Sequence, residues 1–317
     1  LLKQAGERIE YRVEITPTVG GQEDAVLRVL ASSKIIPLDD LGFSASNLEH
    51  FKDMVHKPYG IILCVGPTGS GKTTTLHSAL AEINTPETKI WTAEDPVEIT
   101  QEGLRQVQVH PKIGFTFESA LRSFLRADPD VIMIGEVRTR EGMDHAIAFA
   151  ETGHLVFCTL HANNANQAID RIINFFPDEK RQQLLMDLSL NIQAFVSQRL
   201  IPTVDGKRCA AIEILLGTPL IAELILRGEI DGVKEVMKKS ENIGMKTFDR
   251  AVFELCHQKN PPHQSAPPPL TSHLSFASPK ARRTGKLPTS CSTTSIPSER
   301  EKRPATGSVS LSSRTAT

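Results

Sequence analysis

Short apolar runs alternate with segments of helical periodicity through the middle of the chain. Four of these runs are YGIILCV (59–65), KIWTAE (89–94), VIMIG (131–135) and LVFCTL (155–160). Short, mostly apolar runs of this kind are typical of strands buried on both faces, as in parallel sheets that helices cover. The pattern therefore predicts an α/β fold with a mostly parallel sheet.

The chain divides into four predicted parts. The first residues alternate as strands around a turn at Gly20 and Gly21, which predicts the end of a truncated β-rich (α+β) domain. Beyond the last of the four runs, helical periodicity is clearest over 177–200, and one further strand is predicted at 208–216. The predicted parts are residues 1–30, the end of the N-terminal domain; 31–45, a linker; 46–256, the α/β domain with a helical C-terminal subdomain; and 257–317, a tail.

The composition changes abruptly at the tail. Residues 257–317 hold nine of the 20 prolines and nine Lys or Arg against two Asp or Glu, although the whole chain has a net charge of −1. Such a segment has too little apolar surface to offset its ordering entropy, so we expect it to be disordered. A basic tail could dock on acidic lipid or nucleic acid. We prefer the interpretation that it is a non-native extension, such as a shifted reading frame.

The rest of the composition is that of a soluble globular protein. The 317 residues are 39% hydrophobic and 23% charged, which suffices for at least one sizeable core. The five cysteines form no CxxC pair, which suits a reducing cytoplasm. No apolar stretch approaches the ~20 residues that a membrane span needs. Because the chain starts at Leu1 without a methionine, we expect it to be a fragment of a longer protein.

The clearest chemical motif is GPTGSGKTTTL at residues 66–76, which matches G-x-x-x-x-G-K-[ST]. A buried-strand run precedes it and a helix start follows it. In this context the backbone amides wrap a phosphate, Lys72 reaches the outer phosphates and Thr73 binds Mg²⁺. The motif predicts binding of ATP with Mg²⁺. The predicted binding residues are Gly66, Pro67, Thr68, Gly69, Ser70, Gly71, Lys72, Thr73 and Thr74.

A P-loop also needs an acid on a neighbouring strand to hold the water shell of the metal and to polarise the attacking water. The segment DPDVIMIGEVR offers Asp128 and Asp130 before the strand and Glu136 after it. Ligands of open α/β sheets bind beyond the carboxyl ends of the strands. This rule selects Glu136 as the catalytic and metal-associated acid.

The same rule brings a second acidic cluster to the nucleotide edge. In KIWTAEDPVE, the residues Glu94, Asp95 and Glu98 all lie at or beyond the end of the predicted strand. Glu98 is therefore a competing candidate for the base. Acidic residues that cap helices are the alternative interpretation of this cluster.

Two histidines flank the apolar run LVFCTL. A strand over this run puts His154 before it and His161 after it, so only His161 falls on the nucleotide edge, where it could sense a γ-phosphate. Metal ligation is not supported, because no cysteine or third histidine is spaced to join the pair. A hydrogen-bonded surface histidine remains the alternative for His161.

Four segments in this order resemble a known family. GPTGSGKTTTL, TAEDPVE, DPDVIMIGEVRTREG and TGHLVFCTLHANNA are similar to the Walker A, Asp box, Walker B and His box of the motor ATPases of type II secretion and type IV pili. The resemblance covers about residues 8–256 and implies a hexameric ring of RecA-like P-loop domains. It further implies that Arg12 and Arg28 approach nearby phosphates as arginine fingers, with surface arginines on strands as the alternative.

The resemblance also implies an activity and its partners. ATP hydrolysis would power pilus assembly, pilus retraction or secretion, with Glu136 polarising water and His161 coupling loss of the γ-phosphate to ring motion. The implied partners are further copies of the chain, as a homohexamer, and an inner-membrane platform protein. The chain would thus lie on the cytoplasmic side of the bacterial inner membrane, associated with it through that partner.

Some segments depart from the family pattern. Many assembly and secretion members carry four cysteines before the strand that corresponds to 210–216; here only Cys209 is present, so no zinc is expected. Residues 217–225 and 244–255 resemble retraction motors, although Ala222 stands where these have an arginine. The earlier segments NTPE and VQVHPKIGFTF are more similar to assembly motors.

Two other functions are compatible with the same core. One is a nucleic-acid translocase, but the folded part is net acidic and has no basic stripe with interleaved aromatic residues, so no nucleic-acid partner is expected. The other is a scaffold that binds ATP to assemble a ring without hydrolysing it.

Overall fold

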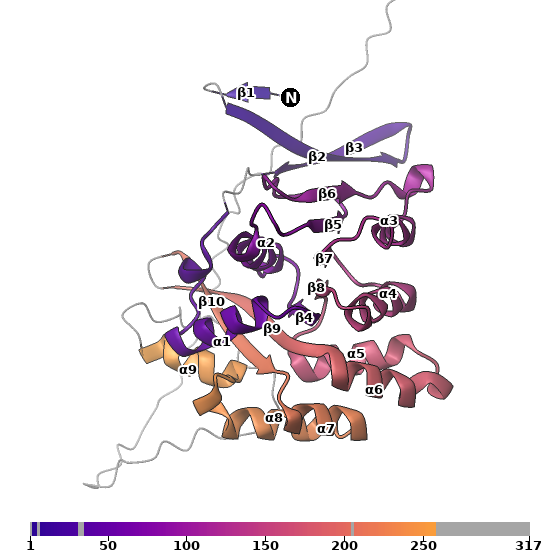
Figure 1. Ribbon diagram of the computed structural model, residues 1–317. Helices are drawn as coiled ribbons and strands as arrows, with labels where there is room; N and C mark the ends of the chain where they lie inside the picture. The colour runs from indigo at the N-terminus through magenta and orange to yellow at the C-terminus, as the bar shows by residue number, and fades with distance from the viewer. Residues whose placement is uncertain (1, 5–6, 31–34, 204–205, 258–317) are drawn as a thin grey trace, which may run out of the picture. The chain divides into compact units, whose positions relative to one another are not determined.

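The computed structural model describes residues 2–4, 7–30, 35–203 and 206–257, of which residues 2–4, 7–10, 12 and 28–30 are described by their backbone alone. Figure 1 shows these residues as a ribbon. The predicted tail, 257–317, lies outside the described residues except for His257.

A seven-stranded sheet runs through the described part of the chain. Its strand order is β10-β9-β4-β8-β7-β5-β6, and every neighbouring pair is parallel except β10 with β9. The strands are β4 (Gly60–Val65), β5 (Ile90–Glu94), β6 (Arg105–Gln108), β7 (Val131–Ile134), β8 (Leu155–Leu160), β9 (Ile192–Pro202) and β10 (Arg208–Leu216). All four apolar runs are strands, and β4, β7 and β8 are buried along their whole length, as predicted for a mostly parallel sheet.

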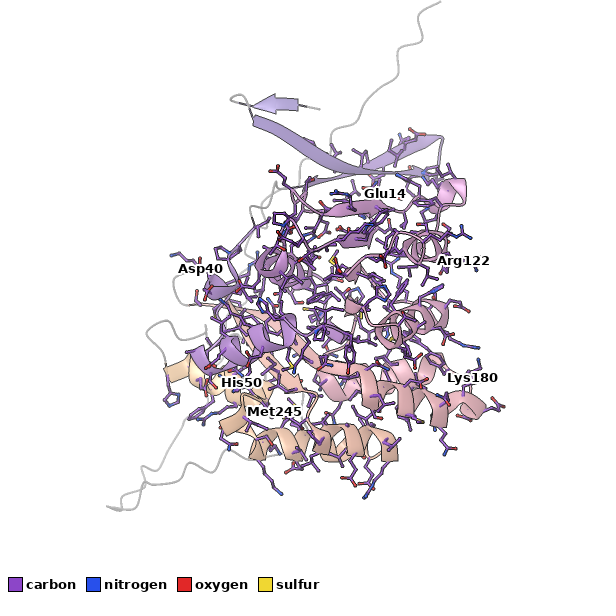
Figure 2. All side chains as sticks on the ribbon, in the orientation of Figure 1. Glu14, Asp40, His50, Arg122, Lys180 and Met245 are labelled. Carbon is purple, nitrogen blue, oxygen red and sulfur yellow. The ribbon has the colours of Figure 1, made fainter. Side chains whose placement is uncertain are left out.

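Helices cover both faces of this sheet. Figure 1 shows α1 and α2 on one face and α3 to α6 on the other, while α7 packs against α6 and α8 against α5. The helices are α1 (Ala45–Val55), α2 (Lys72–Ile83), α3 (Phe117–Phe124), α4 (Arg140–Glu151), α5 (Ala165–Phe175), α6 (Arg181–Asn191), α7 (Pro219–Arg227), α8 (Ile230–Lys239) and α9 (Phe248–His257). Figure 2 shows side chains filling the space between these layers. The arrangement is the predicted α/β fold.

The last helix is tied to the first one and to the sheet. Asn47 of α1 donates through its Nδ2 to the carbonyl oxygen of Gly244 at 2.6 Å, and the neighbouring Met245 is buried (Figure 2). Lys246 pairs with Ile214 of β10 through two backbone hydrogen bonds of 2.9 and 3.0 Å, and α9 then packs on β10. Residues 244–257 therefore pack against the larger sheet.

The prediction was wrong over residues 192–200, where helical periodicity suggested a helix. Helix α6 ends at Asn191, and β9 then enters the sheet between β10 and β4. Most of β9 is buried, and it makes strand pairs along both of its edges. Pairing and burial of this extent override a weak local helix propensity. The short strand β6 was also not predicted, whereas the strand at 208–216 is confirmed.

A separate three-stranded antiparallel sheet precedes the larger one in the sequence. Its order is β1-β2-β3, with bounds Leu2–Gln4, Glu7–Thr18 and Gln22–Leu30. The β2–β3 turn contains Gly20 and Gly21, which both have positive φ, as the sequence predicted for a hairpin here. The assignment of these strands to the end of a larger domain, and of 31–45 to a linker, stays a prediction.

Candidate functional site

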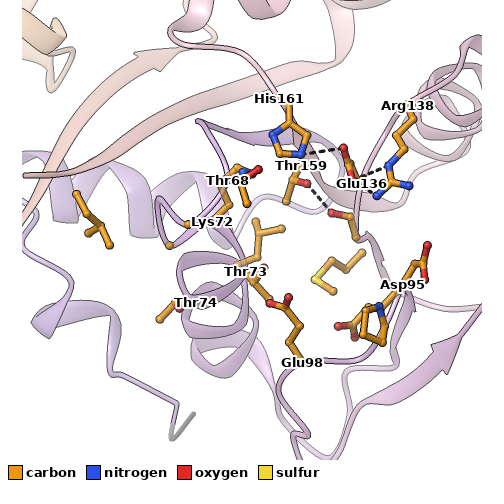
Figure 3. A pocket seen from close by; sticks show the side chains of 18 of the residues that line it. Thr68, Lys72, Thr73, Thr74, Asp95, Glu98, Glu136, Arg138, Thr159 and His161 are labelled. Carbon is orange, nitrogen blue, oxygen red and sulfur yellow. Dashed lines mark hydrogen bonds and ion pairs between the residues drawn. The ribbon is translucent and has the colours of Figure 1, made fainter. Parts of the chain in front are cut away.

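A cavity of about 580 Å³ lies at the carboxyl ends of β4, β5, β7 and β8, and Figure 3 shows it from close by. Parallel strands of an open sheet direct their following loops to this edge, which is where ligands of such folds bind. The cavity brings together residues that are far apart in the sequence. Of the residues predicted at the nucleotide edge, those that line it are Thr68, Gly69, Gly71, Lys72, Thr73, Thr74, Glu94, Asp95, Glu98, Glu136 and His161.

The P-loop follows β4 and leads directly into α2. Gly66 stands at the end of the strand with φ 155°, and a Cβ placed there would lie 2.4 Å from the carbonyl oxygen of Gln198. Gly71 is the N-cap of α2, in the left-handed region with φ 91°. The loop therefore directs the first amides of α2 toward the cavity, which is the geometry of an anion-binding helix N-terminus.

Lys72 is held within this loop. Its Nζ donates to the carbonyl oxygens of Gly66 at 2.9 Å and of Pro67 at 3.0 Å. Burial lowers the pKa of Lys72, and Cys64, Glu136 and Glu98 act in the opposite direction. The ammonium thus lies close to both candidate acids while it is anchored to the loop.

Gln198 of β9 packs against the P-loop, a contact that could not be predicted because its segment was assigned to a helix. The Thr75 hydroxyl donates to Gln198 Oε1 at 2.6 Å. The side-chain nitrogen of Gln198 would lie 2.9 Å from a Cβ at Gly71. The backbone carbonyl of Gln198 therefore leaves no room for a Cβ at Gly66, and at Gly71 the positive φ adds to the contact with the Gln198 side chain in favouring glycine.

Glu136 follows β7 and lies between two nitrogen-bearing side chains, as the dashed lines of Figure 3 show. Its Oε1 is 3.0 Å from His161 Nε2, and its Oε2 accepts from Arg138 Nη2 at 2.6 Å and Nε at 2.7 Å. The hydrogen bond to Glu136 raises the pKa of Arg138. The two oxygens of the carboxylate are therefore fixed in direction by residues from the ends of β7 and β8. Sequence reasoning missed Arg138, although its position two residues after Glu136 could have suggested it.

The second acidic cluster divides into buried and exposed members. Glu98 is exposed, lines the cavity and points toward Thr73 in Figure 3. Glu94 is buried, with its Oε1 accepting from the Thr92 hydroxyl at 2.7 Å and from Gln106 Nε2 at 3.0 Å. Burial alone would raise the pKa of Glu94, but His77, whose Nε2 lies 3.6 Å from Glu94 Oε2, and the hydrogen bonds from Thr92 and Gln106 outweigh burial and lower the pKa. Glu98 and Asp95 are thus exposed at the cavity, whereas Glu94, which also lines it, is buried and held by its hydrogen bonds.

The family of the chain is decided by its match to a family model. Residues 1–259 match the family described as Type II/IV secretion system protein. The chain belongs to this family. The predicted resemblance to secretion motor ATPases is therefore confirmed.

Within this family, several relatives are similar over much of the chain. The chain is 50% identical over 215 residues to the type IV pilus ATPase PilU of Pseudomonas aeruginosa, covering 66% of this chain and 56% of the relative. It is 40% identical over 230 residues to the retractation ATPase PilT of that organism, covering 71% and 65%, respectively. It is 43% identical over 206 residues to type II secretion system protein E of Xanthomonas campestris, covering 65% and 35%. The chain spans less than two thirds of the length of each of these relatives.

Solved structures show the same fold. The pilus retraction motor PilT, crystallised with bound ADP, superposes with a TM-score of 0.69 at 34% identity, covering 79% of this chain and 71% of that one. The ATPase DotB of Legionella pneumophila gives a TM-score of 0.70 at 26% identity, covering 82% and 73%. These similarities confirm the predicted RecA-like fold of this Type II/IV secretion system protein.

The two histidines of this family member lie at opposite edges of the sheet. His161 follows β8 at the cavity, whereas His154 precedes β8 and its carbonyl oxygen accepts from the amide of Gly60, the first residue of β4, at 3.1 Å. His154 Nδ1 lies 3.0 Å from the carbonyl oxygen of Phe149. His154 therefore contacts no residue of this cavity, and the role predicted for His161 stays a prediction.

The two candidate arginine fingers lie in the small antiparallel sheet. Arg12 of β2 is the Cα partner of Arg28 of β3. Their side chains lie outside the described residues, so their predicted roles remain untested. Among the residues with described placement, no group of three or more His, Cys, Asp or Glu could hold a metal ion, and no helix is both long and apolar enough to cross a membrane.

Proposed function

We propose that this family member is the ATP-hydrolysing part of a motor for type IV pili or type II secretion. The observation that carries the proposal is that one cavity unites Lys72 of the P-loop, the Glu136 carboxylate and His161. Loop amides and the Lys72 ammonium provide the positive charge that a polyphosphate needs, and a fixed carboxylate beside it can orient a water molecule.

The cavity also suits the cofactor expected with ATP. The Thr73 hydroxyl and the Glu136 carboxylate line the same space, and oxygen ligands of this kind are those that Mg²⁺ prefers. Mg²⁺ would supply charge that neutralises the phosphates. Thr73 would bind it directly and Glu136 through its water shell.

Each residue then has a defined task in hydrolysis. Lys72 binds the outer phosphates, and Glu136 polarises the attacking water, with Glu98 as the competing base. His161, in contact with Glu136 Oε1, senses loss of the γ-phosphate and transmits it to the chain. Arg12 and Arg28 are proposed to approach the phosphates, as arginine fingers do in other NTPases.

The assembly state and the surroundings are proposed from the resemblance to this family of machines. PilU, PilT and secretion protein E are parts of pilus or secretion machines by name. We accordingly propose a homohexamer that acts on a platform protein at the cytoplasmic side of the bacterial inner membrane. Relatives of both the pilus and the secretion type match at comparable identity, so the proposal is made for the motor class as a whole.

Two substitutions test hydrolysis directly. Lys72→Ala and Glu136→Gln should each lower Mg-dependent release of phosphate from ATP by at least about 100-fold, because each removes an electrostatic contact to the reacting groups. Lys180→Ala and Glu141→Gln are matched controls, since both side chains are exposed and neither lines the cavity. Undiminished turnover in both site variants, or a wild-type chain that hydrolyses no ATP, contradicts the proposal.

A further inference from the structure

A buried carboxylate outside the cavity joins three elements of the fold. Glu213 of β10 is 4% exposed. Its Oε1 accepts from the amide of Ala165 at 2.9 Å and from the Ser197 hydroxyl at 3.0 Å, and its Oε2 accepts from the amide of Phe248 at 3.1 Å. Burial raises the pKa of Glu213, which these hydrogen bonds counteract. No Lys or Arg within the described ranges forms an ion pair with it.

Burial of such a carboxyl group is unfavourable in free energy unless hydrogen bonds compensate for it. A buried acid loses its hydration, and only its hydrogen bonds compensate for this loss. Two of the three donors are the first amides of helices, Ala165 in α5 and Phe248 in α9, which have no partner within their own helices. Glu213 therefore fixes the starting points of two helices from a single position on β10.

The hydrogen bond from the amide of Ala165 connects Glu213 to α5, the helix that follows His161. Ala165 is the first residue of α5 and stands four residues after His161. Further along α5, Arg171 Nη1 donates to the carbonyl oxygen of His161 at 2.8 Å. Helix α5 thus holds the main chain of His161, and Glu213 holds the start of α5.

The contact with Ser197 connects Glu213 to β9, the strand that packs against the P-loop. The next residue along β9 is Gln198, which accepts from Thr75 and lies against the P-loop. Successive residues of a strand face opposite sides of the sheet, so Ser197 faces Glu213 while Gln198 faces the loop. One carboxylate is therefore hydrogen-bonded to both the element behind the P-loop and the helix behind His161.

We infer that Glu213 is a positioning residue for ATP hydrolysis, because it fixes the start of α5 so that His161 stays 3.0 Å from Glu136. The inference rests on the proposed ATPase function. Glu213 contacts no reacting atom, since it does not line the cavity. Its effect passes through His161.

The substitution Glu213→Leu tests this assignment, because it removes both acceptor oxygens, and with them all three hydrogen bonds, at similar side-chain volume. We expect kcat to fall about tenfold, as misplacement of a catalytic group does, while KM for Mg-ATP changes by less than about twofold. Glu213→Gln keeps one carbonyl oxygen, so it should retain part of the rate. An unchanged kcat in Glu213→Leu overturns the inference.

A double-mutant cycle separates positioning from general support of the fold. If Glu213 acts through His161, then Glu213→Leu combined with His161→Ala should be no slower than His161→Ala alone. If Glu213 only supports the fold, the two losses should multiply, and this result overturns the inference. Should the Leu variant fail to fold, the same cycle with Glu213→Gln decides the question.

A measurement without ATP keeps this test independent of the proposed function. Glu213→Gln or Glu213→Leu should speed hydrogen exchange of the amides in 161–166, while exchange in 72–83 stays as in the wild type. Unchanged exchange in 161–166 overturns the inference even if the wild type is an active ATPase. Conversely, a wild type without ATPase activity contradicts the proposed function. In that case hydrogen exchange of the amides in 161–166 still shows whether Glu213 holds this segment.

Discussion

The substitution Gly66→Ala tests whether the P-loop depends on close contact with β9. A Cβ at this position would lie 2.4 Å from the carbonyl oxygen of Gln198 and 2.5 Å from Ser70 Oγ, and the backbone has φ 155°. Ordinary contacts of a Cβ begin near 3.4 Å, so the loop or the strand must move by roughly 1 Å. Gly69→Ala is a matched control in the same loop, because its φ is 76° but a Cβ there has no neighbour within 4 Å.

The two substitutions differ in one component of their cost. Both place alanine at a positive φ that L residues rarely adopt, which costs about 1–3 kcal/mol at each position. Only Gly66→Ala adds overpacking, which costs about 1–3 kcal/mol. If the loop moves to relieve the overpacking, ATP binds more weakly. A loss of about 1–3 kcal/mol in binding free energy corresponds to a roughly 5- to 150-fold increase in Kd. Any part of the strain that the loop does not relieve appears instead as lost stability.

The assay therefore measures both quantities in the same preparations. Titration with a fluorescent ATP analogue gives Kd, and thermal unfolding without nucleotide gives Tm. We expect Gly66→Ala to bind at least about fivefold more weakly than Gly69→Ala, or to unfold at a Tm lower by several degrees, or both. If the two variants agree within twofold in Kd and within about one degree in Tm, the contact between Gln198 and the P-loop does not restrict this position.

Two further predictions concern the buried core. Burial raises the pKa of Cys64 and of Cys158 to about 12, so at pH 8 only about one in ten thousand of these thiols is ionised. Iodoacetamide should therefore label the exposed Cys256 but neither buried cysteine. Mass spectrometry of native samples checks this, and labelling of Cys64 before unfolding would contradict it. Phe157→Ala, in the fully buried strand β8, should lower the free energy of unfolding by about 3–5 kcal/mol in urea titrations. Phe253→Ala, at a residue that is 48% exposed, should lower it by at most about 1 kcal/mol. Equal losses in the two variants would refute the burial argument.

The nucleotide edge could be predicted from order along the chain. Glu136 and His161 each follow a short apolar run, and strands that are parallel place such residues at one edge. Their separation of 3.0 Å could not be predicted, because it depends on the pairing of β7 with β8. Arg138 was missed although its contact with Glu136 could have been suggested, since residues two apart on an extended chain lie on the same side.

The strand β9 shows where prediction from local pattern ends. Its sequence continues directly from α6, and no glycine or proline marks the boundary at Ile192. Strand pairing on both sides decided its conformation, and these partners, β4 and β10, lie elsewhere in the sequence. The supporting roles of Gln198 and Glu213 were therefore not accessible from sequence.

The sequence by itself determined the α/β fold class, the P-loop and the edge of the sheet at which its acids lie, because these depend on local periodicity and on residue order. The tertiary structure alone decided which side chains meet across that edge. The ion pair of Glu136 with His161, the contact of Gln198 with the loop and the three hydrogen bonds of Glu213 all join elements distant in sequence. Contacts of this kind arise only when strands pair and helices pack, since they depend on which strands become neighbours, and the strand order of this sheet is not the order along the chain.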